Sequence, residues 1–244
     1  MEKSIKALFF DLYGTLLVFK DYERSDKDWI KAFYDLAGKS NNLSLKETQL
    51  ICYEILERNI TKDKSGELTT YETKIKIIFE KKGISFSKKE LRKIADQSVE
   101  VWQKNILPAE DCFSVLNELR KKYKLALITN FDHSPHIRKL LRQFDLHNKF
   151  DLIIISDEVE CTKPNPEIFN LALNHFNLKP SEAIYIGDNI YDDIAGSFNA
   201  GITPILIDRN SRSNHRDNQN YNNAQNNLPN YRVINSLPEL LTVL

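Results

Sequence analysis

The chain has few of the features that assign a protein to a specialised class. Its 244 residues include three cysteines, Cys52, Cys112 and Cys161, which are too few and too scattered for a disulfide framework or a zinc site. Such sparse cysteine usage is typical of a reducing compartment, and we expect each thiol to be buried. No apolar run approaches the roughly 18 residues that a membrane-spanning helix needs, and no internal repeat is visible.

The chain also lacks a net charge. Lys plus Arg and Asp plus Glu both number 34, so no overall field attracts nucleic acid or an acidic membrane surface. The N-terminus leads directly into an apolar segment without the organisation of a secretory signal peptide. We therefore expect a cytoplasmic protein that binds neither nucleic acid nor membrane, as a monomer or homodimer.

The most informative segment that is present is Phe-Phe-Asp-Leu-Tyr-Gly-Thr-Leu at residues 9–16. The almost continuously apolar run 5–10 is typical of a parallel strand that is buried on both faces. Ligands of open α/β sheets bind outside the carboxyl ends of the strands, where Asp11 would lie. Asp11 is thus a candidate nucleophile, and Tyr13 stands where a related motif would carry a second carboxylate.

Residues from about 21 to 107 read as helices. Four segments have apolar residues at helical spacing: 25–38, 44–60, 70–82 and 87 to about 102. Ser44 with Glu47 and Ser87 with Glu90 form capping boxes, and Gly83 is placed as a helix C-cap. We predict a four-helix insertion early in the chain.

Beyond Pro108 predicted strands and helices alternate. The strands are expected at 124–129, 150–156, 183–187 and 204–208, and the helices at 111–122, 136–144, 166–176 and 192–199. This alternation predicts an α/β fold with a parallel sheet and right-handed crossovers. Residues 231–234 and 237–244 are expected to add a last strand and helix.

An asparagine-rich stretch separates these last elements from the rest. Residues 210–230 hold nine Asn and little to bury, so we expect a mobile loop. Arg209, Arg212, His215 and Arg216 could bind an anion there, although a solvated loop is the simpler interpretation.

Polar residues follow four of the predicted strands. They are Asp11, Thr129 with Asn130, Ser156 with Asp157, and Asp188. A parallel sheet would bring the central ones to one edge, where the amides that follow a strand can bind an anion. Lys163 lies just before a predicted helix, and Pro164 and Pro166, which follow it, stiffen this approach. Each residue alone also fits a structural role, as a helix cap or a solvated charge.

Together these residues resemble the four motifs of the haloacid dehalogenase (HAD) superfamily. Asp11-Leu-Tyr-Gly-Thr15 resembles the first motif, Thr129-Asn130 the second, Lys163 before Pro164 the third, and Gly187-Asp188 with Asp193 the fourth. The resemblance covers nearly the whole chain and is closest to a phosphatase-like subgroup. It implies a Rossmann-like catalytic core at 1–16 and 108–244, and a helical C1-type cap at 17–107.

The resemblance also implies a role for each motif residue. Asp11 would attack phosphorus in a small phosphorylated metabolite and form an aspartyl-phosphate, which water then hydrolyses. Thr129, the backbone near Asn130, Thr15 and Lys163 would bind the phosphoryl group. Mg²⁺ would be the cofactor. Its implied ligands are Asp11, the main-chain carbonyl of Tyr13, Asp188 and, through a metal-bound water or Lys163, Asp193.

Tyr13 departs from the usual phosphatase pattern, which has an aspartate there as general acid and base. A phenol has a reference pKa near 10, against about 3.9 for Asp, so it does not suit both tasks at neutral pH. We therefore predict weak phosphatase activity, or activity on substrates with good leaving groups. Alternatively, Tyr13 only packs beneath the cap.

Two other functions stay open. The L-2-haloacid dehalogenases of this superfamily carry Asp-x-Tyr-Gly-Thr, and their aspartate attacks carbon without metal. They typically lack the Gly-Asp metal ligand, which is present here, and use an early-cap arginine, for which Arg24, Arg58 and Arg92 are not convincingly placed. Three carboxylates beside one lysine also favour a cation. The third possibility is a binding module with vestigial catalysis.

Overall fold

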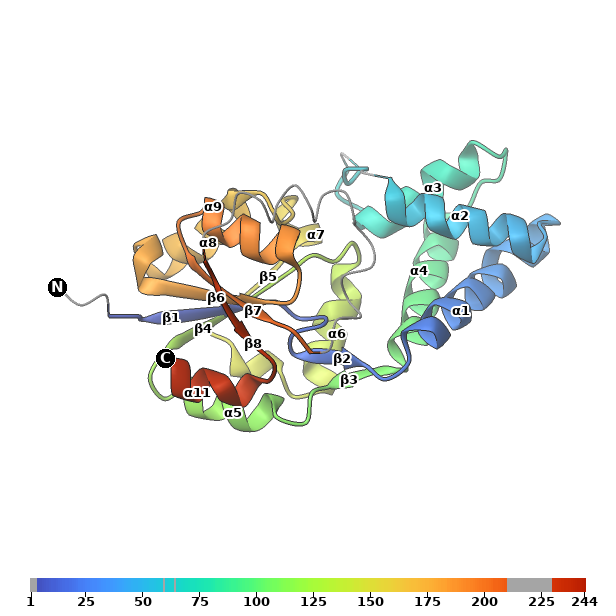
Figure 1. Ribbon diagram of the computed structural model, residues 1–244. Helices are drawn as coiled ribbons and strands as arrows, with labels where there is room; N and C mark the ends of the chain where they lie inside the picture. Colours follow the sequence, from blue (N-terminus) through green and yellow to red (C-terminus); the bar gives the residue numbers. More distant parts are fainter. Residues whose placement is uncertain (1–3, 59, 64, 210–229) are drawn as a thin grey trace. The chain divides into compact units, whose positions relative to one another are not determined.

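The computed structural model describes residues 4–58, 60–63, 65–209 and 230–244 (Figure 1). The chain forms two compact units. One comprises Met1–Val18, Pro108–Asn130 and Leu141–Leu244, and the other Phe19–Leu107 and Phe131–Leu140. The loop predicted at 210–230 lies outside the described residues except for its last position, as do Arg212, His215 and Arg216.

The first unit is built on a six-stranded parallel sheet, which confirms the predicted α/β class. Its strands are β1 (Ala7–Phe10), β4 (Lys124–Thr129), β5 (Leu152–Ile155), β6 (Ala183–Gly187), β7 (Thr203–Ile207) and β8 (Arg232–Ile234). The order is β5-β4-β1-β6-β7-β8. After β1 the chain adds β4 and β5 on one side of β1, and then β6, β7 and β8 on its other side. Ligand sites of open α/β sheets lie at such a switch point.

Helices cover both faces of this sheet (Figure 1). The α-helices after β3 are α5 (Cys112–Leu119), α6 (Ser134–Gln143), α7 (Ser156–Val159), α8 (Pro166–Phe176), α9 (Gly196–Asn199) and α11 (Leu240–Val243). A π-helical segment spans Ile190–Ala195, and 3₁₀ turns span His147–Lys149, Pro180–Glu182 and Leu237–Glu239. α8 and α9 lie on one face and α5 and α11 on the other (Figure 1). The α8 face buries alternate strand residues, among them Phe9, Ile128 and Tyr185.

Several element boundaries differ from the prediction, and two of these differences have a clear local reason. The strand expected at 150–156 ends at Ile155, and Ser156 begins α7 instead, with Asp157 and Glu158 in its first turn. Acidic side chains stabilise the N-terminus of a helix through its dipole. The helix expected from residue 192 begins at Ile190, because the Asn189 side chain accepts hydrogen bonds from the amides of residues 191 and 192.

The second unit contains the predicted helical insertion between β1 and β4. Its α-helices are α1 (Tyr22–Phe33), α2 (Leu45–Glu57), α3 (Thr70–Glu80) and α4 (Lys88–Gln103), with π and 3₁₀ segments at Tyr34–Gly38 and Lys39–Asn41. Both predicted capping boxes are present, and a third, formed by Thr69 and Glu72, was not predicted. Two paired strands, β2 (Leu17–Phe19) and β3 (Ile106–Pro108), were also not predicted, because three residues are too few for a periodic pattern.

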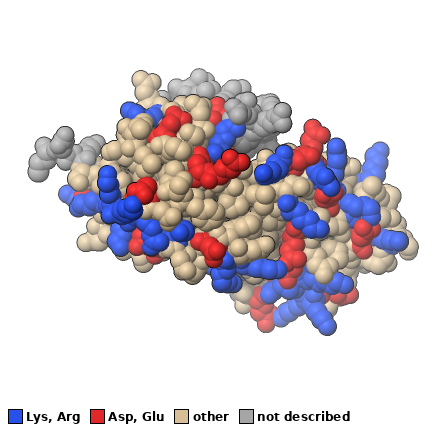
Figure 2. All heavy atoms as spheres, turned by 90° about the horizontal axis from the view of Figure 1, so that it is seen from below, with Lys and Arg blue, Asp and Glu red and all other residues tan. Residues whose placement is uncertain are grey.

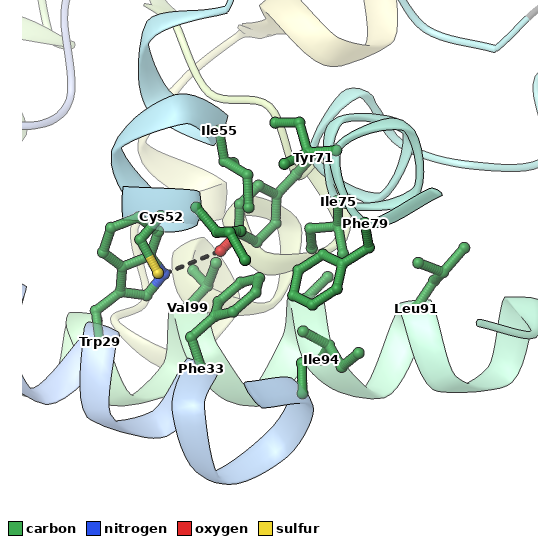
Figure 3. Close-up of a cluster of buried hydrophobic side chains, with 14 of the residues drawn as sticks. Trp29, Phe33, Cys52, Ile55, Tyr71, Ile75, Phe79, Leu91, Ile94 and Val99 are labelled. Carbon is green, nitrogen blue, oxygen red and sulfur yellow. Dashed lines mark hydrogen bonds between the residues drawn. The ribbon is translucent and has the colours of Figure 1, made fainter. Parts of the chain in front are cut away.

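The four helices share one hydrophobic core (Figure 3). All four helices contribute side chains to it, among them Trp29, Phe33, Cys52, Ile55, Tyr71, Ile75, Phe79, Leu91, Ile94 and Val99. The indole Nε1 of Trp29 donates a hydrogen bond to the buried hydroxyl of Tyr71 at 2.9 Å, and this hydroxyl lies 3.1 Å from Ser98 Oγ. The polar atoms of the large aromatic residues therefore have partners inside the core, as burial requires.

A segment that follows the second motif belongs to the same unit. The fully buried ring of His133 lies 3.0 Å from Thr69 Oγ1 and 2.8 Å from Asp96 Oδ1, and Lys74 binds Asp132 at 2.6 Å. The unit that holds the insertion predicted at 17–107 thus also takes in residues 131–140.

Charged side chains of both signs share the surface, as the equal numbers of acidic and basic residues lead one to expect. Figure 2 shows basic and acidic side chains interspersed on the face in view. No helix within the described ranges is both long and apolar enough to cross a membrane.

The cysteines were expected to be buried. Cys52 and Cys112 are buried, as expected, and Cys161 is only half-buried.

Candidate active site

The carboxylates of the first and fourth motifs meet at the switch point of the sheet. Asp11 follows β1, and its amide donates to the carbonyl of Ile186 in β6 at 2.9 Å. Asp188 follows β6 directly. With Asp193 they offer carboxylate oxygens that all lie within 4.8 Å of one another. The sequence prediction that these three residues share one edge is therefore met by the fold.

The turn after Asp11 permits this close approach. Gly14 has a φ of +86°, and a Cβ atom added there would lie 2.0 Å from Oδ2 of Asp188. Its amide donates to the carbonyl of Leu17 at 2.7 Å, and the amides of Leu16 and Leu17 donate to Leu12. Only glycine has the conformational freedom and the small size that this position needs.

Lys163 is the cation of the site. Its Nζ lies 2.6 Å from Oδ1 of Asp11 and 2.6 Å from Oδ1 of Asp193, and the residue is buried. Burial alone would lower the pKa of Lys163, but the charges of Asp11 and Asp193 outweigh it and hold the pKa well above its usual value. Lys163 therefore stays charged between two carboxylates.

The side chain of Asn130 holds the main chain of Lys163 in place. Asn130 Oδ1 accepts from the Lys163 amide at 2.9 Å, and its Nδ2 donates to the Lys163 carbonyl at 3.0 Å. Beyond Lys163, Asn165 caps α8 by accepting from the amide of Glu167 at 3.0 Å. The second motif thus positions the third, a link that the sequence did not reveal.

Asp193 belongs to the π-helical segment that follows β6, and its carboxylate lies against Gly187 at the end of that strand. A Cβ atom at Gly187 would lie 2.3 Å from Cγ of Asp193, so this glycine makes room for the carboxylate. Asp193 Oδ2 accepts a hydrogen bond from the amide of Asn189 at 3.0 Å, and its other carboxylate oxygen, Oδ1, accepts one from Lys163 Nζ. Asp193 thus contacts Lys163 directly, and its action on the reaction stays a prediction.

Tyr185 is a member of the site that sequence reasoning missed. Its hydroxyl lies 3.0 Å from Lys163 Nζ and 3.0 Å from Asp193 Oδ1. In Ala-Ile-Tyr-Ile-Gly the tyrosine reads as part of an apolar strand. The available signal was that a buried tyrosine hydroxyl usually needs a polar partner.

Burial changes the acidity of the first motif. It raises the pKa of Asp11 to about 7, with Lys163 opposing the shift and Asp193 adding to it. Burial and the charge of Asp11 raise the pKa of Tyr13 well above 10. Tyr13 is therefore a neutral phenol at physiological pH.

The remaining predicted residues lie along the same edge. Thr129 ends β4 and is buried, and Thr15 is fully buried with no hydrogen-bond partner for its hydroxyl among the described residues. Arg209, which the sequence placed in a possible anion cluster, instead donates to the carbonyl of Thr15 at 3.1 Å and binds Asp111 at 3.2 Å. It thereby holds the turn of the first motif.

The donor set suits a hard divalent cation. Three carboxylates converge on one place, and two of them, Asp11 and Asp193, contact Lys163. Carboxylate and main-chain carbonyl oxygens are the ligands of Mg²⁺ and Ca²⁺. The absence of a side chain at Gly14 lets the Asp188 carboxylate lie against the turn that follows Asp11.

Comparison with known proteins agrees with this arrangement. A family model described as haloacid dehalogenase-like hydrolase matches residues 10–207. Glyceraldehyde 3-phosphate phosphatase of Methanothermobacter thermautotrophicus is 30% identical over 220 residues, which cover 87% of this chain and 90% of that protein. Human N-acylneuraminate-9-phosphatase is 27% identical over 213 residues, with 84% of both chains covered.

A solved structure extends the comparison to the fold. The crystal structure of a HAD phosphatase from Thermococcus onnurineus has a TM-score of 0.69 and 25% identity, and the match covers 98% of this chain and 97% of that one. The six-stranded parallel sheet with a helical insertion between β1 and β4 matches the HAD core with a cap. The chain belongs to the haloacid dehalogenase-like hydrolase family.

Proposed function

We propose that this chain is a magnesium-dependent phosphatase that hydrolyses a small phosphorylated metabolite through an aspartyl-phosphate at Asp11. One observation carries the proposal: a carboxylate oxygen from each of Asp11, Asp188 and Asp193 lies within 4.8 Å of the others, and Lys163 contacts the first and the last of these residues. Like charges so close raise one another's pKa unless a cation neutralises them. A metal-free reaction at carbon has no need of this arrangement.

The ligands of the cation follow from the donor set. Asp11, Asp188 and the main-chain carbonyl of Tyr13 would hold Mg²⁺, and Asp193 would act through Lys163 or a metal-bound water. When bound, Mg²⁺ supplies positive charge that offsets the negative charge of a phosphoryl group. The Tyr13 ligand is a main-chain atom, so it does not depend on the side chain at this position.

The chemistry would proceed in two displacements at phosphorus. A carboxylate oxygen of Asp11 forms the bond to phosphorus as the bond to the substrate's ester oxygen breaks, and water then attacks phosphorus and restores Asp11. Lys163, fixed by Asn130, orients the Asp11 carboxylate and balances its charge. Thr129, Thr15 and the backbone near Asn130 would bind the phosphoryl oxygens.

Tyr13 limits the rate of this cycle. A phenol whose pKa lies well above 10 cannot take a proton from the attacking water at neutral pH. We therefore propose slow turnover, with preference for substrates whose leaving groups need little protonation. A role for Tyr13 in packing alone is compatible with the same kinetics.

The substrate class is proposed from the relatives. Two of them are named for the hydrolysis of N-acylneuraminate 9-phosphate and glyceraldehyde 3-phosphate. Sugar phosphates are thus the first compounds to test, with nucleoside monophosphates beside them. We propose that residues 17–107 act as a C1-type cap whose side chains select among these compounds.

One experiment separates the candidate functions. Phosphate release from p-nitrophenyl phosphate and the sugar phosphates is measured with Mg²⁺ and with EDTA, beside halide release from 2-chloropropionate. Asp11→Asn should abolish phosphate release, and the matched variant Asp145→Asn, which changes an exposed aspartate of the same unit, should retain it. Metal-independent halide release would refute the phosphatase proposal. If neither product forms in the unmodified protein, a binding module is the better interpretation.

A further inference from the structure

The tyrosine of β6 occupies an unusual place for a polar side chain. Tyr185 is fully buried at the centre of the sheet, paired in register with Phe9, and its ring packs edge-on against Phe169 at a centroid distance of 5.0 Å. A leucine or phenylalanine would fill the same space. The hydroxyl is therefore the feature that requires an explanation.

The hydroxyl completes the hydrogen bonding of Lys163. A lysine ammonium group has three protons, and Lys163 Nζ has three oxygen neighbours: Asp11 Oδ1 at 2.6 Å, Asp193 Oδ1 at 2.6 Å and Tyr185 Oη at 3.0 Å. The hydroxyl accepts from the lysine and can donate its own proton to Asp193 at 3.0 Å, or to the carbonyl of Ile128 at 3.3 Å. Each proton of the ammonium group thus has one acceptor.

We propose that Tyr185 is a positioning residue for the phosphatase reaction, and that its hydroxyl orients the Lys163 ammonium group so that one proton points at Asp11. The inference rests on the proposed function. Because Tyr185 and Asp193 each accept one proton of the ammonium group, the third proton points at the carboxylate of Asp11. Without the hydroxyl the ammonium group can rotate, and its charge is less well aligned with the developing charge on phosphorus.

The surrounding contacts make this role separable from folding. The main chain of Lys163 is held by Asn130, and the ring of Tyr185 is held by Phe169, so neither depends on the hydroxyl. Tyr185→Phe removes one oxygen atom and retains the ring. Hydrogen bonds to charged groups contribute more than neutral ones, so the loss should be felt mainly at the lysine.

The experiment compares Tyr185→Phe with Tyr71→Phe. Tyr71 is a matched control, because its hydroxyl is also buried and hydrogen-bonded, to Trp29 and Ser98, but lies in the other unit. Both variants should lose similar thermal stability. We expect kcat for p-nitrophenyl phosphate to fall about tenfold to a hundredfold in Tyr185→Phe, with KM changed by less than about twofold. Tyr71→Phe should keep kcat within about twofold of the unmodified protein.

A second readout does not depend on activity. In ¹⁵N-lysine NMR spectra the ammonium signal that is missing from Lys163→Met identifies Lys163, and its protons should exchange with water about tenfold faster in Tyr185→Phe. An unchanged kcat, or an equal fall of kcat in both tyrosine variants, would overturn the positioning role. If the unmodified protein releases no phosphate, the proposed function fails. The exchange rate then still tests the contact, and unchanged exchange would overturn that as well.

Discussion

Replacement of Tyr13 by aspartate should raise the phosphatase activity that we propose for this chain. Tyr13 lies two residues after Asp11, the proposed nucleophile, and burial with the charge of Asp11 raises the pKa of Tyr13 well above 10. At pH 7 no more than about one phenol in 10³ is ionised, so almost none can act as a base. An aspartate at this position would be ionised far more often, even with its pKa raised by its neighbours.

The size of the gain follows from this comparison. With its reference pKa of about 3.9, an aspartate is almost fully ionised at pH 7, against about one phenol in 10³. The fraction in the basic form would thus rise by up to about 10³-fold, and general acid–base catalysis is typically worth about 10² to 10⁴. We expect kcat at pH 7 to rise by about 10² to 10³ in Tyr13→Asp. The gain should be larger for an alkyl phosphate than for p-nitrophenyl phosphate, because an alkoxide leaving group also needs a proton.

Rapid-mixing kinetics give the most direct assay. In the unmodified enzyme, p-nitrophenol should appear in a burst followed by a slow phase, because hydrolysis of the aspartyl-phosphate lacks a base. The burst should vanish in Tyr13→Asp. Tyr13→Phe is the control, and it should behave as the unmodified enzyme does if the phenol only packs. A folded Tyr13→Asp variant with unchanged kcat and an unchanged burst would refute the reasoning.

Three further predictions concern the glycine turn, the cation and a buried histidine. Gly14→Ala places a Cβ atom 2.0 Å from the present position of Asp188 Oδ2, so magnesium-dependent turnover should fall by about 10² or more; turnover within threefold of normal would contradict this. Calorimetry with Mg²⁺ at about 100 times its Kd should show about 2.7 kcal/mol of added stability, and an unchanged Tm would argue against a metal site. Burial lowers the pKa of His136 from 6.5 to about 4, so on acidification the unfolded chain takes up a proton before the folded chain does. The free energy of unfolding should therefore fall by about 3 kcal/mol as the pH drops from 6.5 to 4. Denaturant titrations should show a smaller loss of stability in His136→Gln and the full loss in the control His147→Gln, which changes an exposed histidine. Equal losses in both variants would exclude His136 as the cause of the pH dependence.

The elements that the sequence predicted well are those whose determinants are local. β4, β6 and α8 have the expected boundaries, because continuous apolar runs and the Asn165-Pro166 start are encoded within a few residues. The capping boxes at Ser44 and Ser87 are equally local. The order of strands and motifs sufficed to bring Asp11 and Asp188 to one edge, since parallel strands present their carboxyl ends together.

The tertiary structure alone decided how these residues contact one another. Asn130 binds the main chain of Lys163, which lies 33 residues further along the sequence. The hydroxyl of Tyr185 in β6 binds Lys163 across 22 residues of sequence. Such hydrogen bonds have no periodic signature, because they depend on which strands become neighbours and which face each side chain takes. The sequence by itself therefore determined only which residue types follow the strands, among them Asp11 and Asp188. The fold determined which oxygen each proton of Lys163 meets.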